Sequence, residues 1–275
     1  MLTLNCNGRL INWEQPVVMG IINCTPDSFH SKSRVDNMEE ALQKASEMLA
    51  LGASILDIGG QSTRPGSEKI GPELEAERVV PIIQSITQQF PSAIISIDTY
   101  YADVARIAVE SGASIINDVS SGLFDANMLE TVALLKSPYI CMHHGGDSKN
   151  LHAPMDEIKT MSSIIDFFIE RIEACKTAGI KDIIIDPGFG FGKTLEANFQ
   201  IIKEFSSLKI LGKPILLGVS RKSSIYKSLG GTSETALNGT TVLNTVGLMY
   251  GAAIIRVHDV KEAMEAILLT DLIKK

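Results

Sequence analysis

The chain has 275 residues, of which 45% are hydrophobic and 21% are charged, and its formal net charge at pH 7 is −7. This composition is typical of an ordered globular protein, and it excludes a disordered or low-complexity chain. The negative charge argues against nonspecific binding to nucleic acid or to an anionic membrane surface, because both would repel the protein.

The N-terminal segment before Val17 is too short for a domain of its own. We expect a short extension, and one interpretation is a hairpin that covers the floor of the main fold. The segment lacks a basic start followed by an apolar stretch, so the sequence predicts a cytoplasmic protein. The longest uncharged stretch, residues 235–255, contains several Asn and Thr residues and indicates a buried helix followed by a strand, not a membrane span.

Short apolar runs recur along the chain and predict eight β-strands. They are residues 17–22, 54–58, 94–97, 114–117, 138–142, 182–185, 215–219 and 253–257. Stretches with helical spacing lie between them, such as residues 37–53, 72–90 and 155–180. Strands alternating with helices in this way predict a single α/β domain over residues 1–275, a (β/α)8 TIM barrel. A doubly wound sheet is the alternative, although residues 17–22 do not lead into a G-x-G-x-x-G turn.

Polar residues stand at or near the end of every predicted strand. They are Asn23, Asp57, Asp98, Asn117, His143, Asp186, Ser220, Arg221, Lys222, Arg256 and His258. In a parallel barrel all of these lie at the C-terminal mouth, where barrel enzymes place their chemistry. Helix capping is the alternative for any single Asp or Asn, but capping does not explain why cations and carboxylates meet at one rim.

The charges of these strand ends fall into two groups. Hydrogen-bond acceptors follow the third, fourth and sixth strands, at Asp98, Asn117 and Asp186, whereas cations belong to the second, seventh and eighth strands. A carboxylate can accept two parallel hydrogen bonds from a flat heterocycle with adjacent N–H donors. Cationic side chains suit a phosphate or diphosphate. The pattern therefore predicts a ligand with a nitrogen ring at one end and an anionic group at the other.

Seven motifs at the strand ends resemble those of one enzyme family. They are GIINCTPDSF (20–29), DIGGQSTRPGSE (57–68), IDT (97–99), INDVS (116–120), DPGFGFGK (186–193), GVSRKS (218–223) and RVHDV (256–260). Together they cover essentially the whole chain, and through them it resembles the dihydropteroate synthases, which are pterin-binding barrel enzymes of folate synthesis. The resemblance implies condensation of 6-hydroxymethyl-7,8-dihydropterin diphosphate with 4-aminobenzoate, which gives 7,8-dihydropteroate and diphosphate.

The resemblance also implies which residues hold the pterin and the metal. The pterin would be held by Asp98, Asn117, Asp186 and Lys222. The Asp186 carboxylate would take the amino-pyrimidine edge of the ring, and the alternative interpretation is a helix cap before a proline. Asn23 would lie near the diphosphate and its Mg²⁺, an ion that takes few protein ligands; a turn-forming Asn is the alternative.

Further residues are implied for the anionic end and for the second substrate. Arg256 and His258 would bind the leaving diphosphate, with Thr63 and Arg64 arriving on a mobile loop. The aminobenzoate site would be shaped by Thr63, Pro65, Phe191 and Ser220. Asp57 is expected to support the groups that touch substrate. The implied catalytic set is Asp98, Asp186, Lys222, Arg256 and His258. Ordinary core positions are the alternative for His258 and Phe191, although glycines on either side of Phe191 indicate an exposed turn.

The chemistry implied is a dissociative substitution. Loss of diphosphate from the pterin methylene leaves a cation delocalised into the ring, and Mg²⁺, Arg256 and His258 would stabilise the departing oxygens. An arylamine is already neutral and nucleophilic at pH 7, so no strong general base is required. The segments 23–35 and 59–71 are long connections, and we expect them to close over the substrates as lids.

Three features depart from the family pattern. Residues 30–35 read HSKSRV where a glycine pair is expected, Gln61 replaces Glu, and His144 stands where Met or Gln is usual. These departures support one rival hypothesis, a pterin-binding or regulatory paralogue without synthase activity. A second rival is a methyltetrahydrofolate-dependent corrinoid methyltransferase, which keeps the pterin-binding carboxylates, but the S-T-R-P loop and the S-R-K turn weigh against it. The uncharged segment 236–250 offers more apolar surface than one barrel face needs, which with the resemblance predicts a homodimer.

Overall fold

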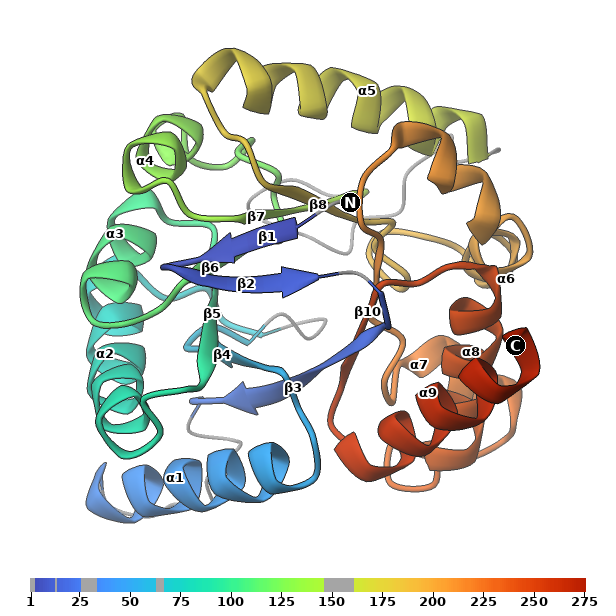
Figure 1. Ribbon diagram of the computed structural model, residues 1–275, viewed down its shortest axis with the longest axis horizontal. Coiled ribbons are helices and arrows are strands. Elements are labelled where there is room, and N and C mark those ends of the chain that lie inside the picture. Colours follow the sequence, from blue (N-terminus) through green and yellow to red (C-terminus); the bar gives the residue numbers. More distant parts are fainter. Residues whose placement is uncertain (1–2, 13, 26–33, 63–66, 146–160) are drawn as a thin grey trace.

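A closed barrel of parallel strands forms the centre of the molecule (Figure 1). The structure is a computed structural model that describes residues 3–12, 14–25, 34–62, 67–145 and 161–275. The strands follow the order β8-β7-β6-β5-β4-β3-β10-β9. A parallel bridge between Ile185 and Ile215, with the Ile185 amide 3.0 Å from the Pro214 carbonyl, joins β8 to β9 and closes the ring. The barrel prediction is confirmed, and the doubly wound alternative is wrong.

The barrel strands coincide with the runs predicted from the sequence. They are β3 (Val17–Asn23), β4 (Ile55–Gly59), β5 (Ile94–Asp98), β6 (Ile115–Asp118), β7 (Tyr139–Met142), β8 (Ile183–Asp186), β9 (Leu216–Leu217) and β10 (Ile254–Val257). Only β9 is much shorter than expected, since its strand pairing ends at Leu217, before the turn that begins at Ser220.

Helices surround the barrel on all sides in Figure 1. They are α1 (Arg34–Ala50), α2 (Pro72–Gln89), α3 (Ala102–Glu110), α4 (Met128–Leu135), α5 (Met161–Ala178), α6 (Leu195–Lys203), α7 (Ser223–Ser228), α8 (Leu237–Tyr250), α9 (Val260–Lys274) and the 3-10 helix η2 (Phe205–Leu211). Within the described residues, no helix is both long enough and apolar enough to cross a membrane.

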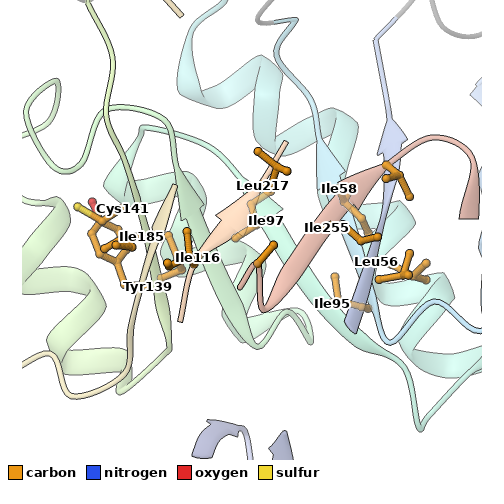
Figure 2. Packing of buried hydrophobic residues seen from close by; sticks show 14 of the residues in the cluster. Leu56, Ile58, Ile95, Ile97, Ile116, Tyr139, Cys141, Ile185, Leu217 and Ile255 are labelled. Atoms are coloured by element: carbon orange, nitrogen blue, oxygen red, sulfur yellow. The ribbon is translucent and has the colours of Figure 1, made fainter. Parts of the chain in front are cut away.

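The strands pack against the helices through alternate side chains. Residues such as Leu56 and Ile58 on β4, and Ile95 and Ile97 on β5, point outward and are buried beneath the helices (Figure 2). Because side chains of a strand alternate between its two faces, the residues between them point into the barrel. The apolar outer layer therefore fixes which strand residues face the interior.

The interior of the barrel has an apolar floor and a polar layer above it. The floor is built from Met19, Ile55, Ile115, Ile140, Ile184, Leu216 and Ile254. Two residues further along their strands, the side chains that point inward on β4, β6, β8 and β10 are Asp57, Asn117, Asp186 and Arg256. The two-residue period of a strand thus carries these polar groups from the floor toward the mouth.

The N-terminal extension is an antiparallel hairpin that covers this floor. Strands β1 (Thr3–Cys6) and β2 (Arg9–Asn12) are joined by Asn7 and Gly8, both with positive φ, as a tight two-residue hairpin turn requires. Leu4, Cys6 and Ile11 pack against the floor residues of the barrel. In Figure 1 the hairpin crosses the middle of the ring. The interpretation as a floor cover is confirmed.

The hairpin should contribute to the stability of the whole barrel. Leu4 is 2% exposed within the floor cluster, so we expect Leu4→Ala to lower the free energy of unfolding by about 2–5 kcal/mol, from lost apolar burial and the cavity left behind. Urea unfolding followed by circular dichroism measures this change.

The matched control is Leu10→Ala in the same hairpin, where the side chain is 69% exposed and the expected change is within about 0.5 kcal/mol. Equal unfolding midpoints for the Leu4 and Leu10 variants would show that the hairpin does not contribute to the core.

Candidate active site

The described polar residues predicted for the site lie together at one end of the barrel. They are Asn23, Asp57, Asp98, Asn117, Asp186, Ser220, Lys222, Arg256 and His258, each on or directly after the C-terminal part of a barrel strand. Thr63, Arg64 and Pro65 lie outside the described residues, as do residues 26–33 of the first predicted lid. The strand ends therefore bring together all those candidates that the structure describes.

Arg256 on β10 is the central cation of this end. Its Nε donates to Asp57 Oδ2 at 2.6 Å, and its Nη2 donates to Asp98 Oδ2 at 2.7 Å. The Asn117 amide donates to the same Asp57 oxygen at 3.0 Å. Burial lowers the pKa of Arg256, but the two carboxylates outweigh it and the net shift of the pKa is upward. Arg256 therefore stays charged inside the barrel.

Asp98 is not fully ionised at neutral pH, although it forms an ion pair with Arg256. Burial raises the pKa of Asp98 to about 7, although the Arg256 guanidinium acts in the opposite direction. Neighbouring carboxyl groups, among them Asp57 and Asp186, raise the pKa further. The carboxyl group at the tip of β5 consequently titrates close to neutral pH.

The acidic and cationic groups are less separated than the sequence suggested. Arg256 contacts two carboxylates directly, and Gly218 lies close to both Arg256 and Asp186. A Cβ added at Gly218 would lie 3.8 Å from Asp186 Oδ2 and 3.9 Å from Arg256 Cβ. The pairing of Arg256 with carboxylates on other strands depends on the register between the strands of the barrel. This register cannot be predicted from the sequence of one strand.

Asp186 is held by a tight turn at the end of β8. Its Oδ1 accepts the Gly188 amide at 2.7 Å, which is an Asx turn. Gly188 has φ +66, and an added Cβ would lie 1.8 Å from the His143 carbonyl oxygen, so only glycine fits. Burial raises the pKa of Asp186. The capping alternative is wrong, because the N-cap of α6 is Thr194, whose hydroxyl accepts the Ala197 amide.

Lys222 lies against the same turn. Its ammonium donates to the Phe189 carbonyl and lies 4.4 Å from the centre of the Phe191 ring, which favours a cation. Burial lowers the pKa of Lys222 to about 8, with the Asp186 carboxylate opposing the change. Lys222 is therefore close to losing its charge in slightly alkaline solution.

Phe191 is neither in an exposed turn nor in the main core. It is 8% exposed and belongs to a small apolar cluster at the mouth, with Tyr100, Val119 and Met142. The prediction from the flanking glycines that Phe191 is exposed is wrong. The side chains that cover Phe191 come from the ends of β5, β6 and β7, which the local sequence does not indicate. Such a cluster can form one wall of a site for a flat ring.

Ser220 and His258 meet above Arg256. Ser220 Oγ lies 3.0 Å from His258 Nδ1 and accepts the His258 amide at 3.1 Å. His258 is an exposed residue at the rim, so the alternative that His258 is an ordinary core residue is wrong. This pair joins the turn after β9 to the turn after β10.

Two supporting residues were missed by sequence reasoning. The Lys193 ammonium donates to the carbonyls of His143, Gly188 and Phe191 at 3.1, 2.8 and 3.2 Å. Asn198 Oδ1 accepts the Gly190 amide at 2.6 Å. Lys193 ends the DPGFGFGK motif and could have been singled out there, whereas nothing in the sequence marks Asn198.

The departures from the family pattern also have local explanations. The Gln61 amide donates to the Glu68 carbonyl at 3.0 Å, and its oxygen accepts the Ile70 amide at 2.8 Å, so it ties the ends of the second long loop together. The His144 ring packs edge-on against Phe124, with ring centres 5.0 Å apart. Neither residue replaces a group of the polar layer.

Asn23 offers a fitting ligand for a magnesium ion. It ends β3 beside Gly59, and within the described parts of the chain its side chain makes no hydrogen bond, which leaves the amide oxygen available. Mg²⁺ binds hard oxygen ligands, keeps several waters and uses substrate phosphates. Among the described residues no group of three or more His, Cys, Asp and Glu side chains could hold a metal. The residues fit an ion held mainly by substrate and water.

Comparisons with known proteins agree with this geometry. Residues 19–258 match the family model described as "Pterin binding enzyme". The chain is 42% identical over 265 residues to a dihydropteroate synthase of Clostridium beijerinckii, covering 94% of this chain and 95% of the relative. It superposes with a TM-score of 0.92 and 36% identity on Xanthomonas albilineans dihydropteroate synthase with 4-aminobenzoic acid, over 99% and 98% of the two chains.

A second solved structure is the Xanthomonas albilineans enzyme in complex with 7,8-dihydropteroate, with a TM-score of 0.88, 34% identity and coverage of 99% of both chains. Likeness of this extent involves the whole barrel, not one motif. The chain belongs to the pterin-binding enzymes and, within them, to the dihydropteroate synthases.

Proposed function

We propose how the residues of this barrel carry out the dihydropteroate synthase reaction of folate biosynthesis. In that reaction 6-hydroxymethyl-7,8-dihydropterin diphosphate and 4-aminobenzoate give 7,8-dihydropteroate and diphosphate. The observation that carries the proposal is the shared polar layer, in which Asp186, Asp98 and Arg256 open onto the same end of the barrel. The family assignment also excludes the corrinoid methyltransferase interpretation.

The pterin ring binds to the acceptors of the polar layer. Asp186 is buried and fixed by its turn, so its carboxylate is oriented before the ring arrives. A carboxylate in such a place can accept two parallel N–H bonds from an amino-pyrimidine edge. Asp98 and Asn117 supply further polar contacts, and Lys222 lies against the turn that holds Asp186.

The diphosphate leaves toward the cations at the rim. Arg256 uses Nε and Nη2 for the barrel carboxylates, and its remaining N–H groups make no hydrogen bond to a described residue. These donors, with His258, stabilise negative charge that builds on the departing oxygens. Bond breaking precedes attack, since the pterin ring delocalises the resulting cation and the arylamine needs no base. Phe191 and Ser220 shape the aminobenzoate site, and Lys222 lies near the bridge between the two substrates.

Magnesium completes the anionic end in this proposal. Asn23 would hold the ion through its amide oxygen, together with the substrate diphosphate and water. When bound, Mg²⁺ neutralises charge on the leaving group. The chain's own contribution is to place the Asn23 amide and the Arg256 guanidinium on neighbouring strands, β3 and β10.

The reaction can be tested by a coupled diphosphate-release assay. We expect release to require the dihydropterin diphosphate, 4-aminobenzoate and Mg²⁺ together. Asp186→Asn should lower kcat/KM by about 10-fold to 150-fold, because a charge-assisted hydrogen bond of about 1.5–3 kcal/mol is lost.

The matched control is Asp182→Asn, which lies before the same strand at the floor end, where Asp182 accepts the Asn5 amide at 3.3 Å. It should behave as the wild type. Loss of activity in both variants, or in neither, would contradict the assignment of Asp186. A wild-type protein that binds pterin without releasing diphosphate would instead be the paralogue without synthase activity.

The pH dependence of kcat/KM should be bell-shaped. Asp98 must be ionised to pair with Arg256 and accept from the ring, and its pKa of about 7 means that activity falls as the pH drops below that value. Lys222 must be charged, and its pKa of about 8 means that activity falls as the pH rises above it. The expected maximum lies between about pH 7 and 8.

The two limbs can be assigned by substitution. Asp98→Asn should remove the acid limb at reduced activity. Lys222→Arg should move the alkaline limb to higher pH, because a guanidinium does not lose its proton in this range. An alkaline limb that stays unchanged in Lys222→Arg would show that another group causes it.

A homodimer is proposed from the apolar surface of α8 and α9. The two helices lie together in Figure 1 and expose large apolar side chains. These are Val242, Met249 and Tyr250 on α8, with Leu268, Leu269, Leu272 and Ile273 on α9. Contiguous apolar patches on soluble proteins mark interaction sites, and a second copy related by twofold symmetry would cover this one.

Light scattering at micromolar concentration should give twice the mass of one chain. Leu272→Glu should give the single-chain mass, because a charge in an apolar interface is costly. Leu134→Glu is the control, since Leu134 is more exposed, at 75%, and its helix α4 lies on the other side of the barrel from α8 and α9 in Figure 1. A wild type with the mass of one chain would overturn the dimer.

A further inference from the structure

The turns after β9 and β10 both carry residues proposed for the substrate site. Ser220 and Lys222 lie in the first turn, and His258 lies in the second. Arg221 and Asp259 are their immediate neighbours, and neither has a place in the reaction as derived so far. Their side chains meet, although they are 38 residues apart in the sequence.

The contact between Arg221 and Asp259 is bidentate. Arg221 Nε donates to Asp259 Oδ2 at 2.9 Å, and Nη2 donates to Oδ1 at 2.7 Å. Arg221 Nη1 donates to the carbonyls of Ser233 and Glu234 at 3.0 and 3.3 Å. The planar guanidinium thus fixes both the distance and the angle between its partners. Isolated surface ion pairs lack this geometry and contribute little.

The backbone at Arg221 is also held in an unusual conformation. Its φ is +55, a left-handed value that arginine adopts only when its surroundings require it. The Arg221 amide donates to Thr240 Oγ1 on α8 at 3.0 Å, which anchors the turn from the other side. The side chains of Ser220 and Lys222 therefore reach the mouth while the side chain between them runs toward α9.

A second link between the same turns lies beside the ion pair. Ser220 Oγ contacts both the ring and the amide of His258, at 3.0 and 3.1 Å. These two residues are proposed to touch substrate, whereas Arg221 and Asp259 lie one residue further along each turn. The ion pair between Arg221 and Asp259 consequently sets the distance between the two turns that the contact between Ser220 and His258 needs.

We infer that Arg221 and Asp259 are positioning residues that hold His258, through its contacts with Ser220, in register for the anionic part of the substrate. The inference rests on the proposed role of His258 at the diphosphate. The pair acts on diphosphate binding and not on the pterin ring, because no member of the pair contacts Asp186 or Asn117. The Asp259 carboxylate raises the pKa of Arg221, so the ion pair persists at neutral and alkaline pH.

Equilibrium binding to the full chain tests this role with two probes, inorganic diphosphate with Mg²⁺ and free 6-hydroxymethyl-7,8-dihydropterin. Arg221→Gln and Asp259→Asn should each weaken diphosphate binding by about 10-fold to 100-fold, since small misplacements of binding groups are costly. Binding of the free pterin should change by less than about twofold. The double variant should bind diphosphate no more weakly than Arg221→Gln, because both changes break one interaction.

The Asp259 variant separates positioning from simple charge. Removing a carboxylate makes the rim more positive, so long-range attraction alone would strengthen diphosphate binding. Diphosphate binding in Asp259→Asn that equals or exceeds the wild type would overturn the inference. So would a lower unfolding midpoint in both variants with unchanged dissociation constants, which would make the pair purely structural.

The control variant is Arg106→Gln on α3, which breaks an exposed ion pair between Arg106 Nη2 and Asp103 Oδ1 at 3.0 Å. It should leave both dissociation constants unchanged. If Arg221→Gln fails to fold, Asp259→Asn still decides the question through the sign of its effect. Failure of the proposed function is a different result, namely no diphosphate release by a wild type whose binding of both probes is normal.

Discussion

The guanidinium of Arg256, held between two carboxylates inside the barrel, is the interaction on which the rest of the site depends. Asp57 is fully buried, and a carboxylate in such a place is costly unless it is paired and hydrogen-bonded. Arg256 and Asn117 supply that pairing from two other strands. The acceptors for the ring and the cation for the anionic tail therefore stabilise each other before any ligand binds.

The same arrangement keeps the polar layer in a finely balanced state of charge. Three carboxyl groups, Asp57, Asp98 and Asp186, share the interior with Arg256 and Lys222. Burial opposes the charges of Asp98, Asp186, Lys222 and Arg256, and pairing only partly offsets it for Asp98 and Lys222. A ligand that brings N–H donors to one end and negative charge to the other satisfies both sets of groups. The apolar floor and outer layer hold the frame rigid while this happens.

Much of this could be predicted from the sequence because strand periodicity fixes which side chains share a direction. All eight barrel strands were foreseen, although β9 ends earlier than predicted, and so were the candidate residues that the structure describes at the mouth. The contacts between strands were not, since the partners of Arg256 depend on barrel register and side-chain reach. The burial of Phe191 depends on three other strand ends in the same way, and the flanking glycines gave no sign of it. Lys193 and Asn198 support the turn after β8 through hydrogen bonds to its backbone carbonyl and amide groups. The positions of these backbone groups cannot be predicted from the pattern of residue types.

The floor of the barrel places a constraint on synthesis of the chain. Leu4 and Ile11 are synthesised long before two of the residues they cover, Leu216 and Ile254. The hairpin itself is local, but its apolar face has no complete surface to meet until β10 has been made. Contacts of such sequence separation close slowly. The apolar face of the hairpin must therefore stay uncovered, or be shielded by a chaperone, until β10 has been synthesised.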